Sequence, residues 1–302
     1  MYCLDDKRFV DLKLTDLRNV FHKELDAMYG KEEVDSFFFL CTEFYIDLPR
    51  FQLALQPEFS LLKSEYDIFF NALEGLKQQK PIQYILGETE FYGLKFNVNK
   101  NVLIPRPETE ELVDWILKSS IFHNKKESLK ILDIGTGSGC IAISLAHNIK
   151  KAEVYAVDVS EKALKLAKHN AEINNTEIQF IEANILNQTN WELVFNNLEF
   201  DIIVSNPPYV RQLEKQEIKP NVLDNEPHLA LFVEDSNPLK FYNAITDFAV
   251  NYLKPNGHLF FEINQYLSEE TKQLLLNSSF ENVELRQDIN GNFRMLKGTK
   301  TI

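Results

Sequence analysis

Residues 131–146, "ILDIGTGSGCIAISLA", have the pattern of a buried strand, a glycine-rich turn and an apolar helix. Glycine at positions 135, 137 and 139 lets the backbone approach a ligand closely, and the N-terminus of the following helix presents free N–H groups. The spacing G-x-G-x-G differs from the G-x-G-x-x-G of dinucleotide-binding folds. This stretch therefore predicts a nucleotide-type ligand at a strand end of an α/β domain.

From the start of this stretch onward, short apolar runs alternate with helical patterns. The seven candidate strands are residues 129–134, 153–158, 177–183, 200–205, 257–263, 283–288 and 293–298. Because crossover segments join successive strands, we expect most of them to lie parallel. The pattern predicts a doubly wound, mostly parallel seven-stranded α/β sheet with helices on both faces.

The first 80 residues have almost no strand pattern. Apolar residues follow helical spacing along three faces, and they include Leu17, Phe21, Phe38, Phe69 and Leu76. We expect a small N-terminal helical domain at residues 1–80, whose Phe-rich faces form either a core or a groove for a partner.

The segment that follows carries alternating apolar residues and glycine. It predicts a linking β-hairpin within residues 81–105 and a second domain at residues 106–302. Pro105 and Pro107 end the extended segment and open a helix, since proline is accepted in the first helical turn.

Composition restricts the function further. The chain has 302 residues and a formal net charge of −13, which disfavours a protein that holds nucleic acid through its phosphates. It has no secretory signal pattern and no apolar run near the roughly 20 residues of a membrane span. The three Cys and six His are scattered, so we expect a cytoplasmic protein without a metal site.

Two further strand ends complete a predicted ligand site. Asp158 ends the strand after the glycine-rich turn, where a carboxylate can accept both hydroxyls of a ribose. Asn184 and Ile185 follow the next strand, where they either contact an adenine ring or belong to a plain loop. With Gly135 to Gly139, Thr136 and Ser138 included, this pattern predicts an adenosine-type ligand without a pyrophosphate, and S-adenosylmethionine fits it.

The sequence "NPPY", residues 206–209, follows the fourth strand of the domain. Pro207 and Pro208 fix φ and remove two N–H donors, which leaves a stiff turn. The Asn206 side-chain oxygen and the Pro207 carbonyl are then two fixed acceptors for a planar NH₂ group, and Tyr209 would stack on that group. Holding both protons turns the nitrogen lone pair towards a sulfonium methyl and stabilises the charge that grows on nitrogen. The alternative interpretation of residues 206–209 is a rigid turn in which the Asn and the Tyr have no role in binding.

Several segments resemble one enzyme family. They are "YILGETEFYGLKFNV", "LIPRPETEELV", "LDIGTGSGCIAISLA", "VSNPPYV", "NEPHLAL" and "DINGNFR". Together they are similar to the release factor glutamine methyltransferase family (PrmC/HemK), across nearly the whole catalytic part, the hairpin and a helical N-terminal domain.

The resemblance implies methyl transfer from S-adenosylmethionine to the glutamine amide of the Gly-Gly-Gln motif in class I peptide chain release factors, with no direct nucleic-acid partner. It assigns cofactor binding to Gly135, Thr136, Gly137, Ser138, Gly139 and Asp158. It assigns the glutamine amide to Asn206, Pro207, Pro208 and Tyr209.

Two features depart from the family pattern. Asn184 stands where the family often has Asp, and "FVEDSNPLKFY" follows "EPHLAL" where the family tends to have a Gly-rich turn. The roles of five polar residues stay open: Arg106, Glu108 and Thr109 either line the cleft or brace the hairpin, and Glu226 and Glu262 either border the cleft or make structural hydrogen bonds.

Two other functions remain as alternatives. An adenine amino-methyltransferase acting on nucleic acid would need a basic groove beside residues 206–209 and a pocket for a flipped base, but only Arg211 and Lys215 are basic nearby. A non-catalytic nucleotide-binding module would not require Asn206.

Overall fold

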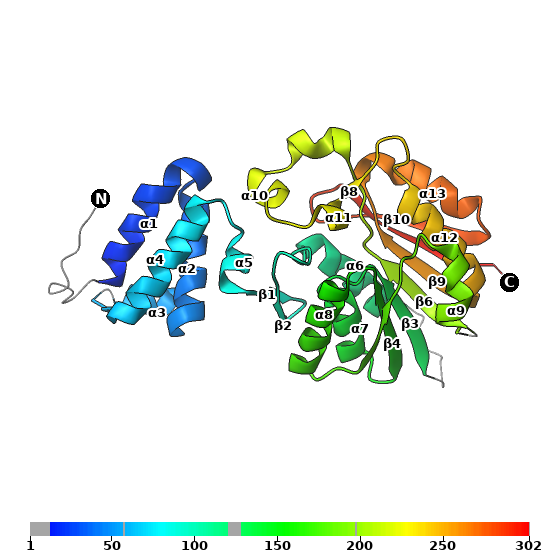
Figure 1. The fold of residues 1–302 in the computed structure, drawn as a ribbon, viewed down its shortest axis with the longest axis horizontal. Helices are drawn as coiled ribbons and strands as arrows, with labels where there is room; N and C mark the ends of the chain where they lie inside the picture. Colours follow the sequence, from blue (N-terminus) through cyan, green and yellow to red (C-terminus); the bar gives the residue numbers. More distant parts are fainter. Residues whose placement is uncertain (1–12, 57, 120–127, 197, 302) are drawn as a thin grey trace. The chain divides into compact units, whose positions relative to one another are not determined.

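The computed structural model describes residues 13–56, 58–119, 128–196 and 198–301. The chain divides into two compact units, Met1–Gly87 and Glu88–Ile302 (Figure 1). The boundary falls at Gly87, whose left-handed φ of 74° ends helix α5, Ile82–Leu86. A left-handed backbone at this position favours glycine because it has no Cβ to clash.

The first unit is helical, as the spacing of its apolar residues predicted. Before α5 it contains α1 (Leu14–Tyr29), α2 (Lys31–Ile46), α3 (Arg50–Leu55) and α4 (Lys63–Lys77). Phe21, Phe38 and Phe69 are fully buried in one core, so the Phe-rich faces are largely internal. Several large apolar side chains of this unit nevertheless remain exposed, among them Phe44, Phe51, Leu55, Leu62 and Phe70.

The second unit contains the predicted seven-stranded sheet. Its strands are β3 (Leu129–Ile134), β4 (Ala152–Asp158), β5 (Ile178–Glu182), β6 (Phe200–Ser205), β9 (Leu253–Glu262), β10 (Phe280–Gln287) and β11 (Phe293–Lys300). Their order is β10-β11-β9-β6-β3-β4-β5. β11 pairs antiparallel with β9 and β10, and the other pairs are parallel. The mostly parallel, doubly wound α/β prediction is confirmed.

Helices cover both faces of this sheet (Figure 1). One face packs on α6 (Pro107–Lys118), α7 (Cys140–Asn148) and α8 (Glu161–Ile173). The other packs on α9 (Trp191–Phe195), α12 (Lys240–Tyr252) and α13 (Ser268–Leu276).

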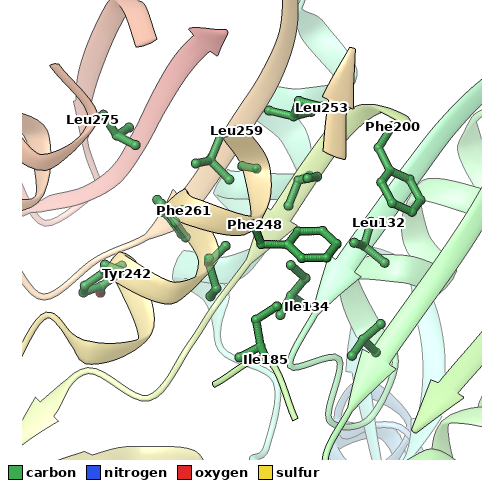
Figure 2. Close-up of a cluster of buried hydrophobic side chains, with 14 of the residues drawn as sticks. Leu132, Ile134, Ile185, Phe200, Tyr242, Phe248, Leu253, Leu259, Phe261 and Leu275 are labelled. Carbon is green, nitrogen blue, oxygen red and sulfur yellow. The ribbon is translucent and has the colours of Figure 1, made fainter. Parts of the chain in front are cut away.

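Alternate residues of the central strands supply the two cores. In β3, Ile131 belongs to the core under α6 and α7, whereas Leu132 and Ile134 face the core that contains Phe248 of α12 (Figure 2). Successive side chains of a strand point to opposite faces, so a run without polar gaps buries both. Every residue of β6 is buried, including the polar Asp201 and Ser205 near its two ends.

The predicted hairpin comes directly after Gly87, where β1 (Glu88–Phe91) pairs antiparallel with β2 (Leu94–Asn97). Phe91 and Phe96 lie in the core beneath α6. The buried Asn170 of α8 accepts from Asn97 N and donates to the carbonyls of Asn97 and Ser138. One side chain thus ties the hairpin to the glycine-rich turn.

After residues 206–209 comes a long connection, residues 210–233, whose structure the strand pattern did not predict. β7 (Val210–Arg211) pairs in parallel with β8 (Phe232–Val233). Between them lie η3 (Gln212–Glu217), α10 (Pro220–Leu223) and α11 (His228–Leu231). The two short strands thus bring the two ends of this connection together. Across the described residues, no helix has the length and apolar character needed to span a membrane.

Candidate active site

The glycine-rich turn joins β3 to α7 in the second unit. Gly135, Gly137 and Gly139 have φ of 76°, 55° and 84°, a region that L side chains rarely adopt. Gly135 N and Thr136 N both donate to Val157 O of β4. The turn is thereby fixed against the neighbouring strand.

The three glycines serve two different purposes. A Cβ at Gly135 or Gly137 would meet no atom within 4 Å, so the backbone there borders open space. A Cβ at Gly139 would lie 2.9 Å from Ile143 Cδ1 and 3.2 Å from Ala167 Cβ. Gly139 therefore allows α7 to pack closely on α8, and it is not among the residues that line the cavity described below.

Asp158 ends β4 beside this turn. Its Oδ2 accepts from Gly137 N and its Oδ1 from Ser160 N, both at 2.9 Å. A carboxylate has about four lone-pair directions, so two acceptor positions remain for the hydroxyls of a ligand. Burial raises the pKa of Asp158, and the backbone N–H groups of Ser160 and Gly137 oppose that rise.

Asp133 is the second-last residue of β3, and its importance was not predicted from the sequence. It is fully buried; its Oδ2 accepts from Thr136 Oγ1 at 2.6 Å and from Ala142 N. Within the described chain its Oδ1 has no hydrogen-bond partner. Burial raises the pKa of Asp133 to about 7. The signal was present in the sequence, because an acidic residue inside an otherwise apolar strand requires a reason.

The end of β5 places Asn184 and Ile185 at the same edge. Asn184 is exposed, and its Oδ1 accepts from Leu186 N. Ile185 is buried at the edge of the core, where its carbonyl accepts from Trp191 Nε1. Both residues line the cavity, while the Asn184 oxygen also closes a local turn.

Residues 206–209 follow β6. Ser205 Oγ donates to Ile134 O at 2.6 Å and joins the ends of β6 and β3. Asn206 Nδ2 then donates to Thr109 Oγ1 at 3.2 Å. Asn206 and Pro208 line the cavity, whereas Pro207 is buried behind them.

Glu262, the last residue of β9, links Asn206 to Tyr209. Its Oε2 accepts from Thr109 Oγ1 at 2.6 Å, and its Oε1 accepts from Tyr209 OH at 2.9 Å. Burial raises the pKa of Glu262, against hydrogen bonds from Thr109 and Tyr209 and the positive charge of Arg294. The Tyr209 hydroxyl is committed to this carboxylate, and stacking of its ring on a substrate stays a prediction.

The remaining open residues differ in position: Glu108 is half-buried in the first turn of α6 and is not among the residues that line the cavity. Arg106 and Thr109 line the cavity. Glu226 is buried and accepts from Arg106 Nη2 and from Ile104 N. Glu226 therefore joins the segment at Ile104 and Arg106 to the connection formed by residues 210–233.

These residues surround a cavity of about 380 Å³. Predicted site residues that line it are Gly135, Thr136, Gly137, Ser138, Asp158, Asn184, Ile185, Asn206 and Pro208. The sequence did not identify the rest of the cavity wall, which comes from residues 100–105 and from Pro227, Leu229, Ala230 and Phe241. This part of the wall is largely apolar, so it excludes water from the polar groups of the cavity.

Comparisons with known proteins agree with this geometry. Residues 116–229, which include the glycine-rich turn and residues 206–209, match the Methyltransferase small domain family. The release factor glutamine methyltransferase of Flavobacterium psychrophilum is 54% identical over 280 residues, which span 93% of this chain and 96% of that protein. The protein of the same name from Bacteroides thetaiotaomicron is 38% identical over 92% of this chain and 97% of its own length. This chain belongs to the release factor glutamine methyltransferase family. The predicted resemblance is thus confirmed.

Solved structures of lower identity show the same fold. The hMettl16 catalytic domain in complex with the MAT2A 3′UTR hairpin 6 has a TM-score of 0.52 and 16% identity, and the match covers 79% of this chain and 82% of that chain. The T. thermophilus 16S rRNA N2 G1207 methyltransferase, solved with AdoMet and guanosine, has a TM-score of 0.50 and 18% identity, covering 70% of this chain and 49% of that chain. At these identities the likeness concerns the fold alone.

Proposed function

We propose that this protein transfers a methyl group from S-adenosylmethionine to the glutamine side-chain amide of the Gly-Gly-Gln motif in class I peptide chain release factors. One observation carries the proposal. Asn206 donates through Nδ2 to Thr109, so its Oδ1 is left as an acceptor at a cavity that Asp158 and the glycine-rich turn also line. An acceptor for an NH₂ group, Asn206 Oδ1, and a site for an adenosine-type cofactor thus share one cavity.

The cofactor side fits S-adenosylmethionine. The positive φ and open space at Gly135 and Gly137 let the ligand approach the backbone. Asp158 keeps free lone pairs for two ribose hydroxyls, and Ile185 supplies an apolar surface for a ring. When bound, S-adenosylmethionine supplies an electrophilic methyl group on a positively charged sulfur.

The acceptor side fits a carboxamide. A glutamine NH₂ is a poor nucleophile because its lone pair is delocalised into the carbonyl. In this proposal, Asn206 Oδ1 and Pro207 O each accept a hydrogen bond from one of its two N–H groups, which orients the lone pair and stabilises the positive charge that develops on nitrogen. Orientation of nitrogen, methyl carbon and sulfur in line contributes much of the rate enhancement.

The reaction balances without a base acting before the attack. A nitrogen–carbon bond forms as the carbon–sulfur bond breaks, and the methylated amide then loses one proton to solvent. The neutral Asn206 suits this task, because a buried carboxylate in its place would add a large desolvation cost.

The partner and compartment follow from the same proposal. A net charge of −13 disfavours capture of nucleic acid and suits a protein loop as substrate. Release factors act during translation, which places the enzyme in the cytoplasm. We assign recognition of the release factor to the N-terminal helical unit.

The test is to incubate the enzyme with S-adenosylmethionine and a release factor, and to map methylation by tandem mass spectrometry. We expect one added methyl on the glutamine of the Gly-Gly-Gln motif. A release factor with glutamate at that position is the matched control and should stay unmodified. Methyl found only on DNA or RNA offered in parallel would overturn the proposal.

A further inference from the structure

Three elements distant in sequence meet at Asn206 in the second unit. Asn206 follows β6, Thr109 lies in the first turn of α6, and Glu262 ends β9. β6 and β9 are parallel neighbours (Figure 1). Ser205 pairs with Phe261, so Asn206 and Glu262 each come one residue after a paired position. Their meeting results from the sheet order.

The donors and acceptors of this group leave little freedom. A carboxylate accepts hydrogen bonds and donates none, and a Thr or Tyr hydroxyl has one proton to donate. The Thr109 hydroxyl donates its one hydrogen bond to Glu262 Oε2, and the Tyr209 hydroxyl donates to Oε1. The Thr109 oxygen is left with lone pairs only, so towards Asn206 it can only accept.

This directionality decides which end of the Asn206 amide is free. Only Nδ2 can donate to Thr109, which leaves Oδ1 as the available acceptor. A half-turn of the amide would instead present Nδ2, a donor, to a substrate NH₂ that has only donors to offer. The amide orientation is therefore critical for binding that group.

We propose that Thr109 and Glu262 are positioning residues for methyl transfer: Glu262 directs the Thr109 hydroxyl, and Thr109 holds the Asn206 amide with its oxygen towards the acceptor nitrogen. The same carboxylate holds Tyr209 in place. This inference rests on the proposed function, since it presumes a substrate that offers an NH₂ group. Neither residue transfers a proton or touches the methyl group.

The experiment compares Thr109→Val, which keeps the shape and removes the hydroxyl, with Thr109→Ser, which keeps the hydroxyl. We expect Thr109→Val to lower kcat by about 10–100-fold, less than loss of Asn206 itself. The Kd for S-adenosylmethionine should stay unchanged, and Thr109→Ser should retain most of the wild-type kcat. Glu262→Gln should behave as Thr109→Val, because a Gln side chain can donate and no longer dictates the hydroxyl direction.

The matched control is Thr271→Val in α13. Thr271 is fully buried and donates to Leu267 O, so this change also removes a buried hydroxyl, at a place remote from the cavity. We expect wild-type kcat from it. A fall in thermal midpoint that is common to both Val variants measures the structural cost of removing a buried hydroxyl. The fall in kcat should appear in Thr109→Val alone.

A double mutant separates positioning from general damage. If Thr109 acts through Asn206, Thr109→Val should cause little further loss in the Asn206→Ala background. Full additivity, wild-type kcat for Thr109→Val, or an equal loss in Thr109→Ser would each overturn the inference. Failure of the proposed function is a separate result, because it appears as absence of glutamine methylation by the wild-type enzyme.

Discussion

The two halves of the cavity are held in place in different ways. In the cofactor half, backbone N–H groups fix Asp158 across sequence separations of 21 and 2 residues, from Gly137 and Ser160. In the acceptor half, side chains hold Asn206 in place. Asn206 and Thr109 are 97 residues apart in the sequence, and Thr109 and Glu262 are 153 residues apart. Local backbone geometry thus builds one half, and tertiary side-chain contacts build the other.

This difference has consequences for substitution. A side-chain substitution does not remove a backbone N–H donor, so the cofactor half should tolerate substitutions of its neighbouring residues. The acceptor half depends on three side chains, and the loss of any one changes the others. Substitutions directed at each half should therefore affect binding and turnover separately.

The largest expected effect concerns the acceptor half alone. Asn206→Ala should lower kcat by about 10²–10³-fold, because one oriented partner of the developing charge is lost. The Kd for S-adenosylmethionine, measured by calorimetry, should stay near the wild-type value. Asn251→Ala, the same change at an exposed position of α12, serves as the control. Equal losses in turnover and cofactor affinity would contradict the separation of the two halves.

The reverse pattern is expected from the cofactor half. Asp158→Ala should raise the Kd for S-adenosylmethionine by about 10–100-fold, because the net loss of one hydrogen bond to a charged acceptor costs about 1.5–3 kcal/mol. At saturating cofactor, kcat should change much less than in Asn206→Ala. Asp247→Ala removes an exposed carboxylate of α12 and should leave the Kd unchanged. An unaltered Kd in Asp158→Ala would reject the ribose-binding role.

A third comparison divides the glycine-rich turn itself. Gly135→Ala adds only backbone strain, at about 1–2 kcal/mol, whereas Gly139→Ala also inserts a methyl between α7 and α8. Such overpacking costs about 1–3 kcal/mol more. Gly139→Ala should therefore show the lower midpoint in thermal denaturation followed by circular dichroism. Equal midpoints would mean that the helix contact can relax.

The stability of the fold should also depend on pH, and this dependence originates at Asp133. Its pKa is raised from 3.8 to about 7 by burial, so the folded protein binds this proton more tightly than the unfolded chain. Its contribution to stability is complete below the unfolded pKa and is lost as the pH rises through about 7. The slope for one proton is at most about 1.4 kcal/mol per pH unit.

Denaturant unfolding at pH 5 and pH 8 measures this contribution. The free energy of unfolding of the wild type should fall between these pH values relative to Asp133→Asn, which cannot titrate. A difference between the two proteins that is constant with pH would show that Asp133 stays ionised in the folded state.

Most of the fold was predictable because its patterns are local. The seven strands appeared as short apolar runs, and the glycine-rich turn and Asp158 are neighbours at adjacent strand ends by the rules of parallel sheets. The β7–β8 pair was missed because two strands of two residues each carry no periodicity. The part of the wall formed by residues 100–105 was missed because the sequence placed that segment in the linking hairpin.

The sequence by itself determined the sheet, the ligand turn, Asp158 and the stiff NPPY corner, because glycine, proline and a two-residue alternation act through the backbone of a few neighbours. Only the tertiary structure decided the roles of Thr109, Glu226 and Glu262. Each of them has a partner more than 90 residues away. The sequence does not indicate which distant strand end a polar side chain will meet. The sheet order brings those ends together, and burial then forces their polar groups to pair.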